Sequence, residues 1–427
     1  MNIGIKNITA LLPDGENVKP EVTSVYVSGK TIAAVGAAPE GFKADKVIDG
    51  KDRLLMPGLI NAHTHSYMAF MRNAADDLPF MDWLFGRVDP IEQKMTDEDA
   101  YWGACLAIME MMRCGTTCFN DMQMNICQTT RAAEESGMRA VICRGLVGNG
   151  DDEAGSSRLK QAFDEMEAFK DCDRLSFRLG PHAPYTCDEA YLRIVAQRAK
   201  EAGLGIHMHL SESSSEVVNC RKDYGCSPIE LADRCGLFEL PFIAAHCVKA
   251  DSNDMDILAA KGVSVVTNPA SNMKLGNGFA PIPEMMKKGI NICLGTDDAA
   301  SNNSLSIIHE MSLLTLIHKG TCRNPETVSA QDAFRFATIN AAKALGLDKE
   351  TGSVEAGKKA DLAIYNMKSP SMWPVNNPVA ALSYSANGTE CETVIIDGEI
   401  TMDKGEYLTL DAERIYFETE KIRERIC

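Results

Sequence analysis

The fold of this chain is decided by one stretch of sequence, Met56-Pro57-Gly58-Leu59-Ile60-Asn61-Ala62-His63-Thr64-His65. Apolar residues lead directly into two histidines, which predicts a buried strand that ends on polar side chains. Its continuous apolar character is typical of a strand covered on both faces, as in a parallel sheet. A helical pattern follows at residues 97–114, so the stretch indicates the first of a series of βα units.

The same alternation of a short apolar run and a helical pattern recurs along the chain, with further helical patterns at residues 188–202 and 303–319. Eight strands alternating with helices over about 250 residues predict an α/β fold, a closed (β/α)8 barrel of the TIM type. An open doubly wound sheet is the alternative, but no Gly-x-Gly-x-x-Gly turn follows the first strand. The predicted strands are residues 54–65, 116–122, 139–147, 176–184, 204–212, 241–248, 263–270 and 290–298.

The two ends of the chain have a different pattern from the middle. Residues 21–35 form two strand-like runs around Ser28-Gly29-Lys30, and residues 393–408 repeat this arrangement around Asp397-Gly398. Both patterns are typical of β-hairpins. Residues 360–365 are a further candidate strand, so we expect β structure at both ends.

Composition and charge restrict the class of protein. Apolar residues make up 45% and charged residues 24% of the chain, which excludes a disordered or fibrous protein. There is no apolar run of about eighteen residues and no signal-peptide pattern, so we expect a cytoplasmic protein without a membrane partner. The net charge of −17 argues against a nucleic-acid partner. The fifteen cysteines include no Cys-x-x-Cys pair, which predicts reduced core thiols.

Six of the eight histidines fall at the carboxyl ends of predicted strands, and Asp297 closes the eighth strand. These ends converge on one face of a barrel, where active sites are built. A single histidine on an apolar segment is more often a core residue. Six at equivalent positions on four strands instead indicate a functional site. The six are His63, His65, His182, His207, His209 and His246.

The spacing His63-x-His65 favours a metal site, because residues two apart in a strand point to the same face. A third imidazole from the fifth strand and the carboxylate of Asp297 would complete the ligand shell and leave one position for water. Nitrogen and oxygen ligands around an open position suit a catalytic zinc or ferrous ion. His207 and His209 share a face, so periodicity leaves open which of them is the ligand.

The opening stretch resembles the first barrel strand of the amidohydrolase superfamily, and the resemblance covers essentially the whole chain. It implies that both ends combine into one small β-sandwich, with residues 1–56 as its N-terminal part and residues 354–427 as its C-terminal part. The metal-dependent catalytic barrel would be residues 57–353. The other matching stretches are His209-Leu210-Ser211-Glu212, Ala245-His246-Cys247, Leu294-Gly295-Thr296-Asp297 and Gly352-Ser353-Val354-Glu355-Ala356-Gly357-Lys358-Lys359-Ala360-Asp361-Leu362.

The resemblance also implies one divalent metal ion per chain, zinc or alternatively iron. Two-metal members usually carry a bridging lysine, which the predicted fourth strand lacks. Members with one metal and His-x-x-Glu on the fifth strand typically deaminate amino-heterocycles, and Glu212 follows His209 at this spacing. His207 then takes a supporting or structural role. The implied ligands are His63, His65, His209 and Asp297.

The implied reaction replaces an amino group on a ring carbon by hydrolysis. A bound ion lowers the pKa of its water toward about 7, which makes hydroxide available at neutral pH. The predicted catalytic residues are Asp297, which accepts the water proton, and His246, which positions the hydroxide. Glu212 delivers a proton to the ring nitrogen before ammonia leaves, a role that typically contributes about 10²–10⁴-fold.

Within the superfamily, the chain is most similar to the 5′-methylthioadenosine/S-adenosylhomocysteine deaminases. Glu92 matches a glutamate that holds the ribose hydroxyls, and His182 matches a histidine on the substrate side. Arg144 and Arg158 match two arginines that recognise a homocysteine carboxylate, which a planar guanidinium binds through two hydrogen bonds. The predicted substrate-binding residues are therefore Glu92, Arg144, Arg158, His182 and Glu212.

The preferred prediction is metal-dependent hydrolytic deamination of an adenosine-type nucleoside to the inosine analogue and ammonia. One alternative is a deaminase or chlorohydrolase of another amino-heterocycle, such as guanine, cytosine or an s-triazine. A remote alternative is a non-catalytic scaffold, which need not retain every ligand and proton-transfer group. We also expect a homo-oligomer. Trp83 and Phe85 are candidates for covering the pocket or for contacting a neighbouring subunit.

Overall fold

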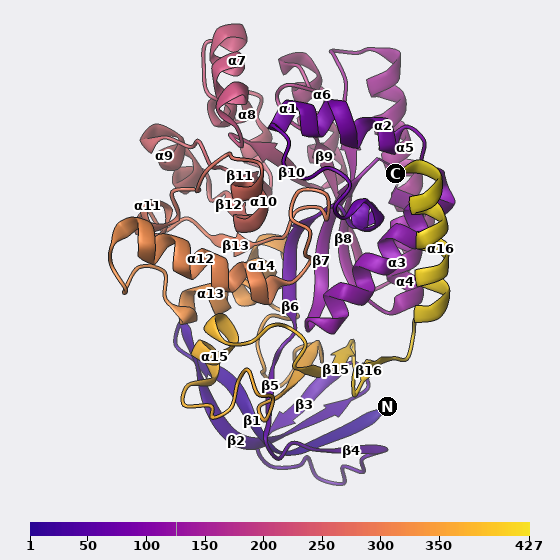
Figure 1. Cartoon of the computed structure of the whole chain (residues 1–427), viewed down its shortest axis with the longest axis vertical. Helices are drawn as coiled ribbons and strands as arrows, with labels where there is room; N and C mark the ends of the chain where they lie inside the picture. Colours follow the sequence, from indigo (N-terminus) through magenta and orange to yellow (C-terminus); the bar gives the residue numbers. More distant parts are fainter. Residues whose placement is uncertain (125) are drawn as a thin grey trace.

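The computed structural model describes residues 1–124 and 126–427 and contains two sheets (Figure 1). The larger sheet has eight parallel strands, which follow one another in space in the order of the sequence. This order matches the eight predicted βα units. The strands are β6 (Leu59–Thr64), β7 (Thr116–Gln123), β8 (Arg139–Leu146), β9 (Leu175–Pro181), β10 (Gly205–Leu210), β11 (Phe242–His246), β12 (Ser264–Thr267) and β13 (Ile292–Leu294).

The first and last strands of this sheet come together and nearly close a barrel. Directly after β13, the backbone N–H groups of Thr296 and Asp297 donate to the carbonyl of His63 on β6, at 3.1 and 3.0 Å. Gly295 permits this approach, because a Cβ at that position would lie 2.8 Å from the His63 nitrogen. The predicted (β/α)8 barrel is confirmed, and the open doubly wound sheet was the wrong alternative.

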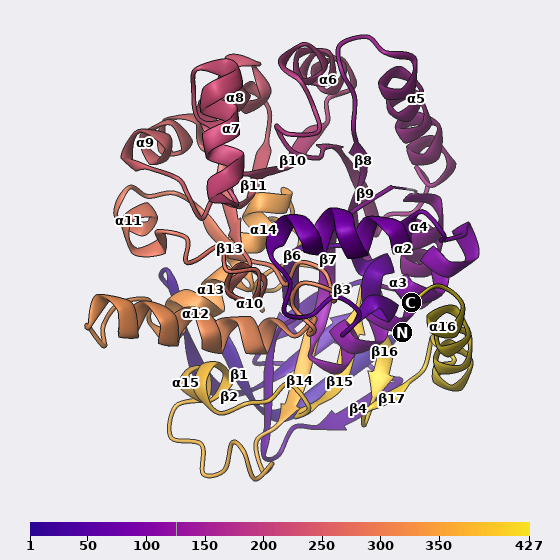
Figure 2. The same ribbon diagram turned by 45° about the horizontal axis from the view of Figure 1, so that its top comes forward.

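Helices surround the barrel strands, as Figure 2 shows from a second direction. The three helices expected from the sequence are present as α3 (Asp97–Arg113), α6 (Glu189–Ala202) and α12 (Ile307–Cys322). The side chain of Thr96 accepts from the Asp99 N–H at the start of α3, which satisfies a free backbone donor there. The remaining helices and helical turns are η1 (Ser66–Met71), α1 (Phe80–Trp83), η2 (Leu84–Val88), α2 (Asp89–Glu92), α4 (Ile126–Ser136), α5 (Glu153–Ala168), α7 (Ser214–Tyr224), α8 (Pro228–Arg234), η3 (Leu237–Glu239), α9 (Ser252–Lys261), α10 (Pro269–Lys274), α11 (Ile282–Lys287), α13 (Ala330–Phe336), α14 (Ile339–Leu345), α15 (Pro378–Tyr384) and α16 (Ala412–Ile426).

The second sheet is mixed and takes its nine strands from both ends of the chain. Strand β5 joins the two ends, because it pairs in parallel with β1 and antiparallel with β14. Both predicted hairpins are present, with turns at Gly29-Lys30 and Asp397-Gly398. The exact domain limits at residues 57 and 353 stay a prediction. The strands are β1 (Asn2–Asp14), β2 (Asn17–Ser28), β3 (Thr31–Val35), β4 (Lys46–Asp49), β5 (Arg53–Pro57), β14 (Leu362–Asn366), β15 (Cys391–Ile396), β16 (Glu399–Asp403) and β17 (Glu406–Tyr407).

One predicted strand divides into two. The sequence predicted a single strand over residues 54–65, whereas β5 belongs to the mixed sheet and β6 to the barrel. The break falls at Gly58, where an added Cβ would lie 2.0 Å from the hydroxyl of Thr117. Because both segments are buried and apolar, the hydropathy pattern contains no sign of the change of sheet.

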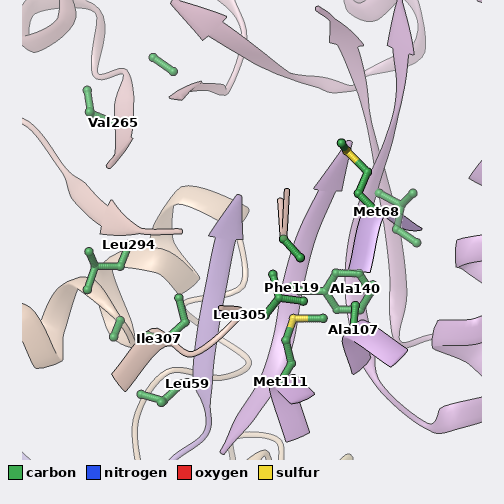
Figure 3. Close-up of a cluster of buried hydrophobic side chains, with 14 of the residues drawn as sticks. Leu59, Met68, Ala107, Met111, Phe119, Ala140, Val265, Leu294, Leu305 and Ile307 are labelled. Atoms are coloured by element: carbon green, nitrogen blue, oxygen red, sulfur yellow. The ribbon is translucent and has the colours of Figure 1, made fainter. Parts of the chain in front are cut away.

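The main core lies between the barrel strands and their helices (Figure 3). Met111 on α3 and Phe119 on β7 are both fully buried members of this cluster. All fifteen cysteines are free thiols and ten of them are buried, as expected for a reduced protein.

In residues 1–124 and 126–427, none of the helices combines the length and apolar character needed to cross a membrane.

Candidate metal centre and active site

Three strand ends bring four potential metal ligands together. His63 lies on β6 and His65 directly follows it, His209 lies on β10, and Asp297 follows β13. One ligand atom from each of the four lies within 4.8 Å of all the others. The Nε2 atoms of His65 and His209 are 3.3 Å apart, and Oδ1 of Asp297 is 3.3 Å from Nε2 of His63. The barrel thus gathers the four residues that the sequence comparison singled out.

The chemical state of these groups fits a divalent metal ion. Nε2 of His63 is buried and has no hydrogen-bond partner. Burial lowers the pKa of His63 to about 4, so its imidazole is neutral and can act as a ligand at pH 7. Burial alone would raise the pKa of Asp297, but the adjacent histidines, His63 first, hold it well below its usual range. Three imidazoles and a carboxylate suit zinc or iron.

Backbone carbonyls orient two of the histidines. Nδ1–H of His65 donates to the carbonyl of Met122 at 2.7 Å, and Nδ1–H of His209 donates to the carbonyl of His182 at 2.8 Å. Each bond fixes the tautomer and leaves Nε2 unprotonated. Both Nε2 atoms are therefore prepared to bind a metal.

The structure resolves which of the two histidines on β10 belongs to the ligand cluster. His209 is one of the four clustered residues, whereas His207 lies behind His63. Nε2 of His207 is 2.9 Å from Nδ1 of His63, on the side of the ring opposite to the ligand atom. The side chain of Asn120 lies 3.0 Å from the other ring nitrogen of His207. His207 therefore supports His63 from inside the barrel.

Asp297 is held by two hydroxyl groups that sequence reasoning missed. Its Oδ2 accepts from Ser271 Oγ at 2.6 Å and from Ser301 Oγ at 3.1 Å, while Oδ1 faces the histidines. Both serines lie after the ends of barrel strands, and this position in the sequence could have suggested that they belong to the site. Many other serines and threonines also follow strands, so the sequence did not single out Ser271 and Ser301.

His246 and Glu212 lie beside the ligand cluster. Nδ1–H of His246 donates to Oδ1 of Asn272 at 2.8 Å, so Nε2 is left as an acceptor. This Nε2 atom is 3.9 Å from both Oε2 of Glu212 and Oδ2 of Asp297. Burial, followed by the charge of Asp297, raises the pKa of Glu212 well above its usual range. This shift favours the protonated form of Glu212, the form that can donate a proton.

A cavity opens onto this cluster. Glu92 lies in its wall and accepts a hydrogen bond from the hydroxyl of Tyr67, a residue that sequence reasoning missed. Trp83 also lines the cavity and is 6% exposed, whereas Phe85 is 50% exposed and is not a lining residue. Of the two aromatic candidates, only Trp83 contributes to the pocket.

His182 is also a lining residue of the cavity, as predicted for a substrate-side group. Thr186 Oγ1 donates to the carbonyl of Ala183, so it accepts from Nδ1–H of His182 at 3.0 Å. This arrangement leaves Nε2 of His182 as a hydrogen-bond acceptor. Burial lowers the pKa of His182 to about 4, which keeps the ring neutral.

The two predicted carboxylate-binding arginines lie off the cavity. Arg144 donates from Nη1 to both carboxylate oxygens of Glu165, at 2.8 and 3.1 Å. Arg158 donates from Nη1 to the carbonyl of Val147 at 3.0 Å. Neither arginine is a lining residue of the cavity. Their role toward a substrate carboxylate stays a prediction.

Comparison with known sequences gives matches over almost the whole chain. Residues 54–401 match the model of the Amidohydrolase family. A 5-methylthioadenosine/S-adenosylhomocysteine deaminase of Thermoanaerobacter pseudethanolicus is 42% identical over 423 residues, which covers 99% of this chain and 98% of that one. A protein of the same name from Acetivibrio thermocellus is 45% identical over 394 residues, 91% of this chain and 90% of the other.

Solved structures of other proteins also match this chain over almost its whole length. An adenosine deaminase from Xanthomonas campestris with bound zinc has a TM-score of 0.94 at 30% identity and covers 99% of this chain and 98% of its own. A zinc-bound atrazine chlorohydrolase from Arthrobacter aurescens has a TM-score of 0.91 at 23% identity, over 99% of this chain and all of its own. The second likeness is one of fold alone.

Proposed function

Because this chain belongs to the amidohydrolase family, we propose that its cavity binds and deaminates adenosine-type nucleosides. The substrates are S-adenosylhomocysteine, 5′-methylthioadenosine and adenosine, and the products are the inosine analogue and ammonia. The main support for this function is the position of Glu212, a buried carboxyl group whose pKa is raised, beside four clustered metal ligands in one cavity.

We infer that the cluster holds one divalent ion, with zinc as the first choice and iron as the alternative. The bound zinc of the Xanthomonas campestris structure supports zinc. When bound, such an ion supplies a water of lowered pKa, about 7. The ligands would be His63, His65, His209 and Asp297.

Two groups of the chain act on the attacking water. Nε2 of His246 accepts a hydrogen bond from it, because the bond to Asn272 keeps the proton of His246 on Nδ1. Oδ2 of Asp297, 3.9 Å from that nitrogen, accepts the water proton. The hydroxyls of Ser271 and Ser301 hold this oxygen in place.

Glu212 acts on the purine ring. Its protonated carboxyl group donates to the ring nitrogen beside the carbon that carries the amino group, which makes this carbon electrophilic. Asn277 donates to Oε1 at 3.0 Å and so fixes the orientation of the carboxyl group. The proton that Asp297 took from the water passes to the amino group, which leaves as ammonia. The remaining hydroxyl proton returns to Glu212, and the ring carbon keeps the oxygen as a carbonyl.

Glu92 and His182 are proposed to hold the rest of the nucleoside. Both line the cavity that contains Glu212. Glu92 would accept from the ribose hydroxyls, and its bond from Tyr67 limits it to one orientation. The neutral ring of His182 would accept from the substrate through Nε2.

We also propose a homo-oligomer in a reducing, cytoplasmic compartment. The exposed apolar side chains of Met81 and Phe85, 49% and 50% exposed, support association with a second copy of the chain. The fifteen free thiols support the reducing compartment. Light scattering coupled to gel filtration measures the oligomeric state, and a monomer at micromolar concentration would contradict this part of the proposal.

The function is tested by ammonia release from adenosine, 5′-methylthioadenosine and S-adenosylhomocysteine, alongside guanine, cytosine and a chlorotriazine. Deamination of one or more nucleosides, with little activity on the three other compounds, is the expected result. Activity confined to a compound without ribose would contradict the substrate assignment and would favour another amino-heterocycle hydrolase.

A further inference from the structure

One fully buried carboxyl group near the site has no part in the steps proposed above. Glu310 lies in the first turn of α12 and is fully buried. Among the described residues, it belongs neither to the four clustered ligands nor to the wall of the cavity. Burial of a carboxyl group is costly unless hydrogen bonds compensate for the lost water. The partners of Glu310 therefore indicate its role.

Both carboxyl oxygens of Glu310 accept a hydrogen bond, each from a different segment of the chain. Oε2 accepts from the backbone N–H of Ala270 at 3.0 Å, and Oε1 accepts from Nδ2 of Asn302 at 2.9 Å. Ala270 lies on α10, which follows β12, whereas Asn302 lies between β13 and α12. Because β12 and β13 are paired, Glu310 joins two segments that follow neighbouring barrel strands.

Each of these two segments also supplies a hydroxyl group to Asp297. Ser271 is the residue after the first donor, and its Oγ donates to Oδ2 of Asp297 at 2.6 Å. Ser301 is the residue before the second donor, and its Oγ lies 3.1 Å from the same oxygen. The two hydrogen bonds of Glu310 therefore fix the residues next to both serines.

The backbone at Asp297 depends on contacts of this kind. Its φ of +63° lies in the left-handed region, which is disfavoured for a residue with a Cβ and persists only where the surroundings hold it. One such contact comes from Asn302, whose Nδ2 also donates to the carbonyl of Thr296 at 2.7 Å. Glu310 thus orients the amide group that binds the residue directly before Asp297.

We propose that Glu310 is a positioning residue for Asp297. This inference rests on the proposed function and adds a residue to it. Glu310 keeps the segments of Ser271 and Ser301 together, so that both hydroxyl groups meet Oδ2 of Asp297 while Oδ1 faces the histidines. Loss of a group that orients a metal ligand typically lowers metal affinity or activity about 10–100-fold.

Glu310→Gln is the first variant of the test. Because both partners of Glu310 are N–H donors, an amide accepts from only one of them and turns its own NH₂ group toward the other. We expect kcat for adenosine to fall about tenfold or more, with KM changed only a few-fold. Zinc affinity, measured by competition with a chelator, should also fall about tenfold or more. Glu310→Asp is too short to reach both donors, and serves if the glutamine variant does not fold.

A matched control separates positioning from a general loss of stability. Glu390 is also a buried carboxyl group, and the backbone N–H of Asn387 donates to both of its oxygens, at 3.2 and 3.1 Å. It directly precedes β15 of the mixed sheet. Glu390→Gln should lower the free energy of unfolding in urea but leave kcat and zinc affinity unchanged.

A variant without the two hydroxyl groups tests whether Glu310 acts through them. In a chain that carries Ser271→Ala and Ser301→Ala, the addition of Glu310→Gln should lower kcat much less than it does in the unmodified chain. The reason is that the contacts that Glu310 maintains are already absent, so the effects are not additive in free energy.

Different results contradict different statements. Unchanged kcat and zinc affinity in Glu310→Gln and Glu310→Asp would contradict the positioning role. An equal loss of both in Glu390→Gln would do the same, as would the full effect of Glu310→Gln in the chain without the two serines. If the unmodified, zinc-loaded chain deaminates no nucleoside, the proposed function itself fails, and zinc affinity still tests the role of Glu310.

Discussion

Oε2 of Glu212 lies 3.9 Å from Nε2 of His246 inside the cavity. The two side chains come from different strand ends, and each is fixed by an asparagine: Asn277 donates to Glu212 and Asn272 accepts from His246. One group is thus prepared to give a proton to the ring and the other to hold the attacking water. This division of roles can be tested by changing each group separately.

Glu212→Gln should retain the metal and lose turnover. The amide keeps the size of the side chain but has no acidic proton for the ring nitrogen, so kcat should fall about 10²–10⁴-fold. Stopped-time ammonia assays with metal analysis of the same sample provide the measurement. A variant with near-normal kcat would remove Glu212 from the mechanism.

Glu92→Gln should weaken substrate binding and affect the chemical step little. Loss of a charge-assisted bond to the ribose predicts a KM for adenosine that is raised about tenfold or more, with kcat changed only a few-fold. The matched substrate is 2′,3′-dideoxyadenosine, on which Glu92→Gln should have almost no effect. An equal increase of KM on both substrates would contradict a contact with the ribose.

The metal-free protein should lose stability as the pH falls below the ordinary histidine pKa. Burial lowers the pKa of His182 from 6.5 to about 4 in the folded chain. Between these values the unfolded chain binds a proton that the folded chain does not. The contribution of His182 is therefore complete above pH 6.5 and decreases toward pH 4, by up to about 1.4 kcal/mol per pH unit.

Urea unfolding of the chelated protein at pH 7.5 and pH 5 measures this effect. His182→Gln should reduce the difference between the two pH values, while His309→Gln, at an exposed position on α12, is the control and should not. Identical pH dependence in all three proteins would show that His182 is not responsible.

Arg139→Met should destabilise the contact between the two sheets. Arg139 on β8 pairs with Asp361 beside β14, and their side chains are 2% and 0% exposed. Removing one partner of a buried pair costs about 3–5 kcal/mol. The control is Arg53→Met, because its pair with Glu392 is 34% and 26% exposed and contributes about 1 kcal/mol or less. Equal free energies of unfolding for both variants would contradict this account.

Much of the site could be predicted because the barrel places strand ends together. His63 and His65 are two apart on one strand, so their common direction follows from local geometry. Asp297 lies beside these two histidines because the eighth barrel strand lies next to the first. The count of eight strands, which predicts a closed barrel, indicates this neighbourhood. Periodicity did not choose between His207 and His209, because both face the interior at different depths.

The features that were missed depend on contacts between distant segments. Arg144 ends a strand and matched a substrate-binding pattern, but its partner Glu165 belongs to the following helix. The pairing with Glu165 could not be read from the strand pattern, and the substrate role of Arg144 stays a prediction. The change of sheet at Gly58 had no such signal, because burial is equal on both sides of it.

The most direct test of the central statement joins product analysis to metal content. The protein is chelated, reloaded with zinc in steps, and assayed for ammonia and the inosine analogue from 5′-methylthioadenosine. We expect both products in equal amounts, with activity that rises in proportion to zinc and saturates at one ion per chain. Full activity in the chelated protein, or saturation only at two ions per chain, would contradict a deaminase with a single metal ion.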